Sequence, residues 1–90
     1  MNESQIIAMV NEVFEESFEI EKKKLQPQMH VFNDLGLDSL DIVDLVVALQ
    51  KKFDVRIRDD ERIRTIQTLG DIYQFITTLK NEIKRESTLK

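Results

Sequence analysis

Ninety residues, 41% of them hydrophobic and 33% charged, indicate one small globular domain and exclude a disordered chain. Thirteen Lys and Arg against seventeen Asp and Glu give a net charge of −4, which disfavours nucleic acid as the main partner because phosphate binding needs a basic surface. The absence of cysteine excludes disulfides and thiolate metal sites and fits a reducing compartment.

The first segment with helical periodicity runs from Glu3 to Phe18, and Asn2 or Ser4 could cap it. Its apolar positions are Ile6, Val10, Val13, Phe14 and Phe18. The opening residues MNESQII lack the basic-then-apolar layout of a signal peptide, and no apolar run is long enough to span a membrane. We therefore expect a cytoplasmic protein without a membrane span.

The next segment, EIEKKKLQPQMHVFNDLG (residues 19–36), breaks this pattern with a charge run, Pro27 and Gly36, and is predicted to be a long loop. Loops of this length are usually functional or ordered by packing. Several apolar side chains could tie it to the core: Leu25, Met29, Val31, Phe32 and Leu35. His30, the only histidine, is interpreted as an exposed loop residue.

The second helix is predicted from about Ser39 to Lys52 and has two apolar faces. One face carries Ile42, Leu45, Val46, Leu49 and Phe53, a set suited to a core. The other carries Leu40, Val43 and Val47, with Asp41 and Asp44 on its flank. Periodicity favours a central helix buried on both faces. The alternative is a docking surface, with aliphatic contacts for affinity and aspartates that steer a basic partner.

The C-terminal part has one short and one long helical pattern. Residues 58–63, RDDERI, indicate a single helical turn opened by Asp59. Thr68 and Asp71 form a capping-box pair before the last helix, and residues 84–90 are expected to fray. The apolar positions of that helix are Ile72, Phe75, Ile76, Leu79 and Ile83. Residues 53–57, FDVRI, could form a short strand but have no partner, so the pattern predicts one all-α domain (residues 1–90) with three main helices.

Ser39 has three possible roles on local features alone. A helix cap, made by Asp38 or Ser39, is the most common reason for such residues at a helix start. A catalytic nucleophile would need a base and an oxyanion site, and His30 in the loop and the absence of a glycine elbow disfavour it. A covalent attachment site is the third role. A phosphodiester there would lie at a helix N-terminus, which favours negative charge, and Gly36 would let a modifying enzyme approach.

The stretch FNDLGLDSLDIVDLVVALQKKFDV resembles the prosthetic-group segment of acyl carrier proteins, whose hallmark is an Asp-Ser-Leu tripeptide after an acidic-Leu-Gly turn. Residues 64–76, RTIQTLGDIYQFI, resemble that family's run into the final helix. The resemblance implies a small four-helix bundle with three main helices and one short one. It also implies that Ser39 carries 4′-phosphopantetheine, whose thiol holds acyl chains as thioesters. Asp38 would help to present the serine from the turn that contains Gly36.

The resemblance assigns further roles by position. Leu40, Val43 and Val47 match the hydrophobic positions of the partner-recognition helix, and Asp41 and Asp44 match its acidic ones. The family shelters part of the acyl chain inside the bundle. Residues that could line this shelter, or equally form plain core, are Phe32, Leu45, Val46, Leu49, Ile57, Ile66 and Ile72. The implied partners of a monomeric carrier are a phosphopantetheinyl transferase and acyl-transfer, ketosynthase or ligase-type enzymes with basic docking patches.

The sequence departs from the family in its charge. Familiar fatty-acid carriers continue the recognition helix with an acidic run, where this chain has Gln50, Lys51 and Lys52. Further basic residues follow: Arg56, Arg58, Arg62 and Arg64. Because steering responds to the summed field, we expect a specialised carrier for a dedicated pathway rather than for the housekeeping fatty-acid synthase.

Three alternatives to an acyl carrier remain. An aminoacyl or peptidyl carrier shares the serine and the fold, although the Asp before Ser39, the Leu after it and the single Gly36 favour an acyl carrier. A helical adaptor would bind through the Leu40 stripe and never be modified. An enzyme is the weakest alternative, for want of a base. Acidic groups such as Asp38 with Asp41 lack calcium-loop spacing and are interpreted as a solvated face, not a metal site.

Overall fold

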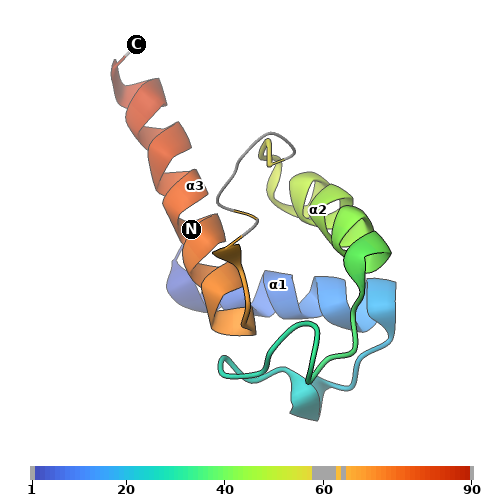
Figure 1. The fold of residues 1–90 in the computed structure, drawn as a ribbon. Coiled ribbons are helices and arrows are strands. Elements are labelled where there is room, and N and C mark those ends of the chain that lie inside the picture. Colours follow the sequence, from blue (N-terminus) through green and yellow to red (C-terminus); the bar gives the residue numbers. More distant parts are fainter. Residues whose placement is uncertain (1, 58–62, 64, 90) are drawn as a thin grey trace.

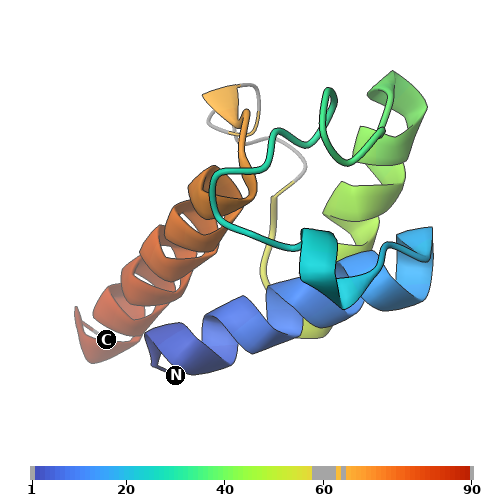
Figure 2. The same ribbon diagram turned by 90° about the horizontal axis from the view of Figure 1, so that it is seen from below.

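Three α-helices form the framework of the part of the chain that the structure describes: α1 (Glu3–Phe18), α2 (Ser39–Phe53) and α3 (Leu69–Leu89). The structure, a computed structural model, describes residues 2–57, 63 and 65–89, and for residues 82–89 only the backbone. α1 lies across the base of the bundle and packs against both α2 and α3 (Figures 1 and 2). The described residues contain no β-strand, so the all-α prediction is confirmed for them.

α1 has the bounds that its periodicity predicts. Of the two predicted caps, Asn2 fills the role: its Oδ1 accepts a hydrogen bond from the Gln5 backbone N–H (2.9 Å), and Gln5 Oε1 accepts one from the Asn2 N–H (3.0 Å). The helix ends where Glu19 adopts the left-handed conformation (φ 55°). Its buried side chains are Ile6, Val10, Val13 and Phe14.

The long loop between α1 and α2 contains one 3₁₀ turn, η1 (Lys22–Lys24), and is ordered by packing. Its backbone is bonded to the segment that leads into α3. Val31 N–H donates to Gln67 O (2.9 Å), Leu69 N–H to Met29 O (3.0 Å), and Gly70 N–H to Pro27 O (2.9 Å). A Cβ on Gly70 would lie 3.1 Å from Pro27 O, so glycine permits this close approach.

The side chains of this loop are not buried equally. Leu25 and Val31 are buried and Met29 and Leu35 are half-buried, as expected of residues that tie the loop to the core. Phe32 is the most exposed of the five, with an exposed fraction of 39%. Its position matters for the site described below.

α2 buries one face and exposes the other. Leu45, Leu49 and Phe53 are buried, and the helix ends one residue beyond the predicted Lys52, where Asp54 adopts the left-handed conformation (φ 54°). The second apolar stripe faces solvent, with exposed fractions of 78% for Leu40, 60% for Val43 and 43% for Val47. The interpretation of α2 as a helix buried on both faces is therefore wrong.

α3 begins with the capping box that its sequence predicts. Thr68 Oγ1 accepts from the Asp71 N–H (3.2 Å), and Asp71 Oδ2 accepts from the N–H groups of Thr68 (3.1 Å) and Gln67 (3.0 Å). The Tyr73 hydroxyl donates to Asn11 Oδ1, which joins α3 to α1. The buried side chains of the helix include Leu69, Ile72, Tyr73, Phe75, Ile76 and Leu79.

Some predictions for the C-terminal half are not decided by the structure. The helical turn predicted for residues 58–63 lies outside the described residues, apart from Ile63. The possible strand at residues 53–57 is not formed. The backbone of α3 is helical to Leu89, and fraying of residues 84–90 stays a prediction, as does the assignment of the chain to a single domain.

Candidate functional site

Ser39 is the first residue of α2, but its side chain does not cap the helix. The cap is Asp38, whose Oδ1 accepts hydrogen bonds from the backbone N–H groups of Leu40 (2.9 Å) and Asp41 (3.0 Å). Asp41 Oδ2 in turn accepts from the Asp38 N–H (3.1 Å). Ser39 is exposed, and its hydroxyl makes no hydrogen bond to any described residue. The capping role that local features favour is therefore filled by Asp38 and leaves the Ser39 hydroxyl free.

The turn before α2 depends on Gly36. Its φ of 77° lies in the left-handed region, which glycine adopts without strain. A Cβ built on Gly36 would meet nothing within 4 Å, so the backbone in front of the serine is open to solvent on this side. A modifying enzyme could approach here, as the sequence suggests.

The N-terminus of α2 is less open to an anion than its sequence indicates. The first N–H groups of a helix have no acceptor within the helix itself. Two of them, those of Leu40 and Asp41, already donate to the Asp38 side chain. The helix dipole still favours negative charge at this end. A phosphate on Ser39 would therefore gain from the dipole but would meet few free backbone donors.

His30 holds the loop together and is not arranged as a base. Its Nδ1 accepts hydrogen bonds from the backbone N–H groups of Phe32 and Asn33 (both 3.2 Å), and its own backbone N–H donates to Asp34 Oδ2 (2.7 Å). It is half-buried, so the prediction of an exposed residue is wrong. Because Nδ1 already accepts from the backbone, this nitrogen cannot also take a proton from a serine without breaking these bonds.

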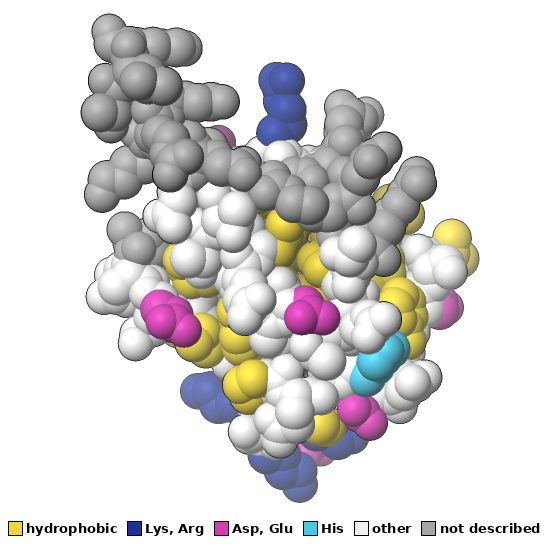
Figure 3. All heavy atoms as spheres, turned by 60° about the vertical axis from the view of Figure 1, so that its left-hand side comes forward, with side chains coloured by type: hydrophobic (Ala, Val, Ile, Leu, Met, Phe, Trp, Pro, Cys, Tyr) yellow, Lys and Arg dark blue, Asp and Glu magenta, His cyan; other side chains and the backbone are white. Residues whose placement is uncertain are grey.

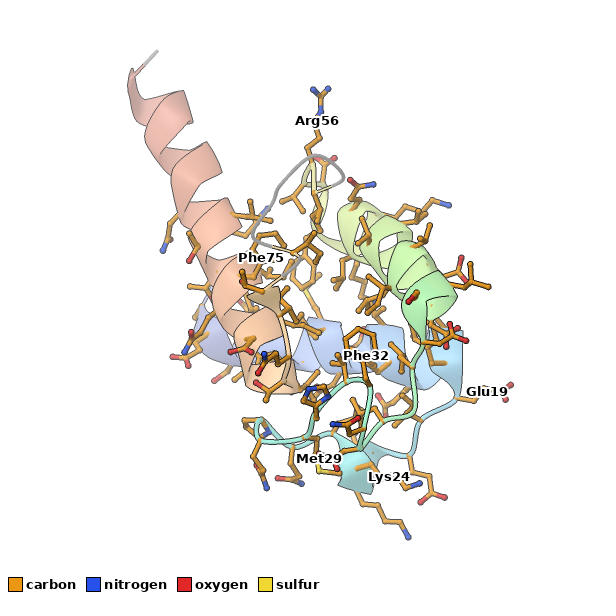
Figure 4. All side chains as sticks on the ribbon, viewed as in Figure 1. Glu19, Lys24, Met29, Phe32, Arg56 and Phe75 are labelled. Carbon is orange, nitrogen blue, oxygen red and sulfur yellow. The ribbon has the colours of Figure 1, made fainter. Side chains whose placement is uncertain are left out.

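An apolar cavity of about 220 Å³ opens beside Ser39. Its lining residues are Phe32, Ser39, Ile42, Leu45, Ile63, Ile66 and Ile72. Figure 4 shows Phe32 pointing from the loop into the space between α2 and α3. The partial exposure of Phe32 thus reflects its position at the wall of a cavity, next to the His30 ring (centroids 5.8 Å apart). Figure 3 shows hydrophobic side chains that reach the surface in patches between polar groups.

The cavity wall and the predicted acyl pocket overlap in part. Four of the predicted residues line the cavity: Phe32, Leu45, Ile66 and Ile72. Three do not, because Leu49 and Ile57 are fully buried in the core and Val46 is half-buried against it. Sequence reasoning missed Ile42 and Ile63. Ile42 carried a signal, since it follows Ser39 by three residues and lies on the same side of the helix.

The residues predicted to recognise partners differ in how free they are. Leu40, Val43 and Val47 are exposed, and so is Asp44. Asp41 is half-buried and its carboxylate is engaged in the capping box. Of the two acidic positions, Asp44 is therefore the one available to a partner.

Two further kinds of site to consider in the described residues are a metal centre and a membrane span. No group of three or more His, Cys, Asp or Glu among them could hold a metal ion, and the acidic run at residues 59–61 lies outside them. None of the described helices is both long and apolar enough to cross a membrane.

Comparisons with known proteins identify the family of the chain. The family described as "Phosphopantetheine attachment site" matches residues 5–76, a span that contains most of α1, all of α2, the cavity wall and Ser39. The chain is also similar to Acyl carrier protein 2 of Ralstonia nicotianae (strain ATCC BAA-1114 / GMI1000), with 34% identity over 79 residues, which are 88% of this chain and 96% of the relative. The chain belongs to the acyl carrier proteins, the family that bears covalently attached 4′-phosphopantetheine.

Proposed function

We propose that Ser39 is the residue that bears the 4′-phosphopantetheine arm and that the chain delivers acyl thioesters to enzymes of fatty-acid, lipid or polyketide-type biosynthesis. The observation that carries this assignment is that the Ser39 hydroxyl is exposed and unbonded in the described part of the chain. Asp38 caps α2, so Ser39 is exposed and makes no hydrogen bond to a described residue. When bound, the arm supplies a thiol, which is the group that this chain lacks because it contains no cysteine.

The residues around Ser39 suit attachment by a separate transferase. The Ser39 oxygen would form a bond to the phosphopantetheine phosphorus of coenzyme A, while the bond from that phosphorus to the nucleotide breaks. The hydroxyl proton must leave to a base of the transferase, because His30 Nδ1 is occupied by backbone donors. The open backbone at Gly36 leaves room for that enzyme. The chain thus acts as a carrier and not as a catalyst.

The apolar cavity suits the tail of the cargo. Aliphatic side chains and Phe32 form its wall, and Ser39 is part of that wall, so a chain tethered there can fold back into it. Burial of each methylene in such a wall gains about 0.8 kcal/mol. This gain, together with the exclusion of water, supports a role for the cavity as a shelter for the acyl chain.

The exposed face of α2 suits contact with the partner enzymes. Leu40, Val43 and Val47 offer aliphatic contacts, and Asp44 offers a charge that steers basic docking patches. Three further points belong to the proposal. The fourth, short helix would lie between residues 58 and 63, mostly outside the described residues, and the carrier would be a monomer. Its location would be cytoplasmic, which the absence of cysteine supports.

The pathway is proposed to be a dedicated one. The far end of α2 carries Lys51 and Lys52, and Arg56 follows it, where the resemblance leads one to expect acidic residues. If the housekeeping ketosynthases elongated acyl chains on this carrier at their normal rate, this part of the proposal would be wrong.

Two alternatives are separated by simple observations. An aminoacyl or peptidyl carrier would be charged in its holo form by an amino-acid-activating ligase and not by an acyl-transfer enzyme. A helical adaptor that is never modified would keep its function when Ser39 is replaced by alanine.

The first experiment is an intact-protein mass measurement. The chain is incubated with coenzyme A, magnesium and a broad-specificity phosphopantetheinyl transferase, alongside Ser39→Ala and the control Ser4→Ala, which changes an exposed serine on α1. We expect one phosphopantetheine on the wild type and on Ser4→Ala, and none on Ser39→Ala. Circular dichroism checks that all three are folded. A folded wild type that gains no mass would contradict the proposal and favour the adaptor.

A further inference from the structure

One face of α2 carries two charges of opposite sign, Asp44 near the middle of the helix and Lys51 in its last turn. The α2 stripe is defined here as Leu40, Val43, Asp44, Val47 and Lys51. Val43 and Asp44 are neighbours in the chain, and the other successive members are three or four residues apart. At about 100° per residue the five side chains lie within about 100° of one another, so they share one side of the helix. All five are exposed. The stripe is thus aliphatic next to Ser39 (Leu40 and Val43), acidic in its middle (Asp44), aliphatic again at Val47 and basic at its far end (Lys51).

The charge at the far end is not used by the fold. Lys52 Nζ lies 2.7 Å from Glu12 Oε2 and joins α2 to α1. Its neighbour Lys51 forms no ion pair with any described residue, and neither does Asp44. Arg56, just after the helix, is also exposed and points away from the bundle (Figure 4). Either lysine would suit the negative end of the helix dipole. Only Lys51 shares a face with Val47.

Asp44 and Lys51 are far enough apart for a partner to interact with each charge separately. Asp44 and Lys51 are seven positions apart on the helix, which corresponds to about 10 Å along its axis. The screening length at physiological salt is about 8 Å. A docking surface therefore meets an anion at one point and a cation at another, and the two do not cancel.

We infer that the acyl-loading enzyme that docks on the α2 stripe presents a cationic side chain opposite Asp44, an apolar patch opposite Val47 and a carboxylate opposite Lys51. The inference rests on the proposed carrier function and adds the chemistry of the partner. Such a pattern fixes the direction of docking along the helix. A uniformly basic docking patch would be repelled at Lys51, so the stripe also selects against enzymes built for acidic carriers.

The test compares two lysine substitutions with the same change in charge. Lys51→Glu reverses the far end of the stripe, and Lys24→Glu is the control, because Lys24 is exposed in η1, forms no ion pair with a described residue and points away from the bundle (Figure 4). The probe is the acyl-loading enzyme from cells that make this chain. Its purification is followed by its activity on the wild-type holo protein. KM and kcat are measured at low and high salt.

We expect Lys51→Glu to raise KM about fivefold at low salt with little change in kcat, the size of effect that exposed charge pairs allow. The difference should shrink at high salt, and Lys24→Glu should behave as the wild type. A lower KM for Lys51→Glu would show that the partner is uniformly basic and would overturn the inference. Equal KM values for the two variants would overturn it too.

The design separates this inference from the proposed function. Each variant is first loaded with phosphopantetheine and its mass is measured, so failure of the wild type to load counts against the carrier function alone. Both lysines are exposed, and thermal melts check that both variants fold. The α2 stripe could instead bind a second copy of the chain, and sedimentation of the wild type shows whether it forms a dimer. A dimer that Lys51→Glu dissociates would assign the α2 stripe to a second copy of the chain and overturn the inference.

Discussion

Asp38 and Asp41 hold the start of α2 by a reciprocal pair of hydrogen bonds, from Asp41 N–H to Asp38 Oδ1 (3.0 Å) and from Asp38 N–H to Asp41 Oδ2 (3.1 Å). Ser39 lies between these two residues in the chain and takes no part in the exchange. The acidic residues around the serine thus stabilise the helix start, and the serine lies in a first turn that these hydrogen bonds hold. Within the Asp-Ser-Leu motif there is thus a division of roles: the aspartate caps the helix, and the serine hydroxyl stays unbonded to any described residue.

The first prediction concerns this division. Asp38→Ala should lower the free energy of unfolding by about 1 kcal/mol, because it removes the cap. Ser39→Ala should change it by less than about 0.5 kcal/mol, because an exposed, unbonded hydroxyl is lost. Urea denaturation of the apo proteins measures both. If Ser39→Ala were as destabilising as Asp38→Ala, the serine would be the cap after all.

The second prediction concerns the turn before the serine. Gly36→Ala should destabilise the protein by about 1–2 kcal/mol, because φ of 77° is strained for a residue with a Cβ although no atom would clash with it. Gly36→Asn is the matched control and should be less destabilising, since asparagine tolerates the left-handed region. Thermal or urea unfolding decides. Equal stability of wild type and Gly36→Ala would mean that the turn changes conformation at no cost.

The third prediction concerns the cavity. Ile42→Phe should fill part of the space beside Ser39, whereas Val46→Phe adds the same kind of bulk at another half-buried position of α2 that does not line the cavity. We expect an octanoyl chain to raise the melting temperature of the wild type and of Val46→Phe above that of their holo forms. Ile42→Phe should lose this increment. Identical increments in the two variants would mean that the chain does not enter this cavity.

The fourth prediction concerns pH. The backbone N–H groups of Gln67 and then Thr68 hold the pKa of Asp71 below its usual value. A carboxyl with a lower pKa in the folded state binds fewer protons than in the unfolded state, so its stabilising effect is present above the unfolded pKa of about 3.9 and is lost as pH falls through the folded pKa. Wild type should exceed Asp71→Asn in stability at neutral pH, and the gap should narrow in acid. Parallel stability curves from pH 7 to pH 2 would contradict this.

The elements defined by short-range chemistry could be predicted from the sequence. α1 has the bounds that its periodicity gives, and the capping box of Thr68 and Asp71 is formed, because both depend on residues three or four positions apart. The side on which a helix meets its neighbours is a long-range property. For this reason the exposure of Leu40 was visible from the family resemblance but not from the periodicity of α2, which predicts burial on both faces.

The candidate site shows the same limit. The Asp-Ser-Leu motif identified Ser39 as a candidate, but no local pattern separates an isoleucine in the core from one at a cavity wall. Ile57 is fully buried, whereas Ile66 and Ile42 line the cavity, and the difference arises only where the loop, α2 and α3 converge. His30 looked like a solvent-exposed residue because its two backbone donors follow it in a turn that the sequence does not specify.

Ser39 lies both on the cavity wall and at the protein surface. If it bears the arm and the cavity shelters the acyl chain, as proposed, then shelter and delivery are competing states of one tether. A cargo chain that lies inside the cavity is withdrawn from an enzyme waiting at α2, so that enzyme binds only the fraction of molecules whose cargo is outside. Its apparent dissociation constant is the intrinsic value divided by that fraction. Each further methylene that the cavity holds shifts this equilibrium about fourfold toward the hidden state, if it gains about 0.8 kcal/mol. The size of the cavity beside Ser39 would then make delivery depend on chain length. Short chains would lie mostly outside the cavity, and longer ones mostly inside it, until the cavity is full.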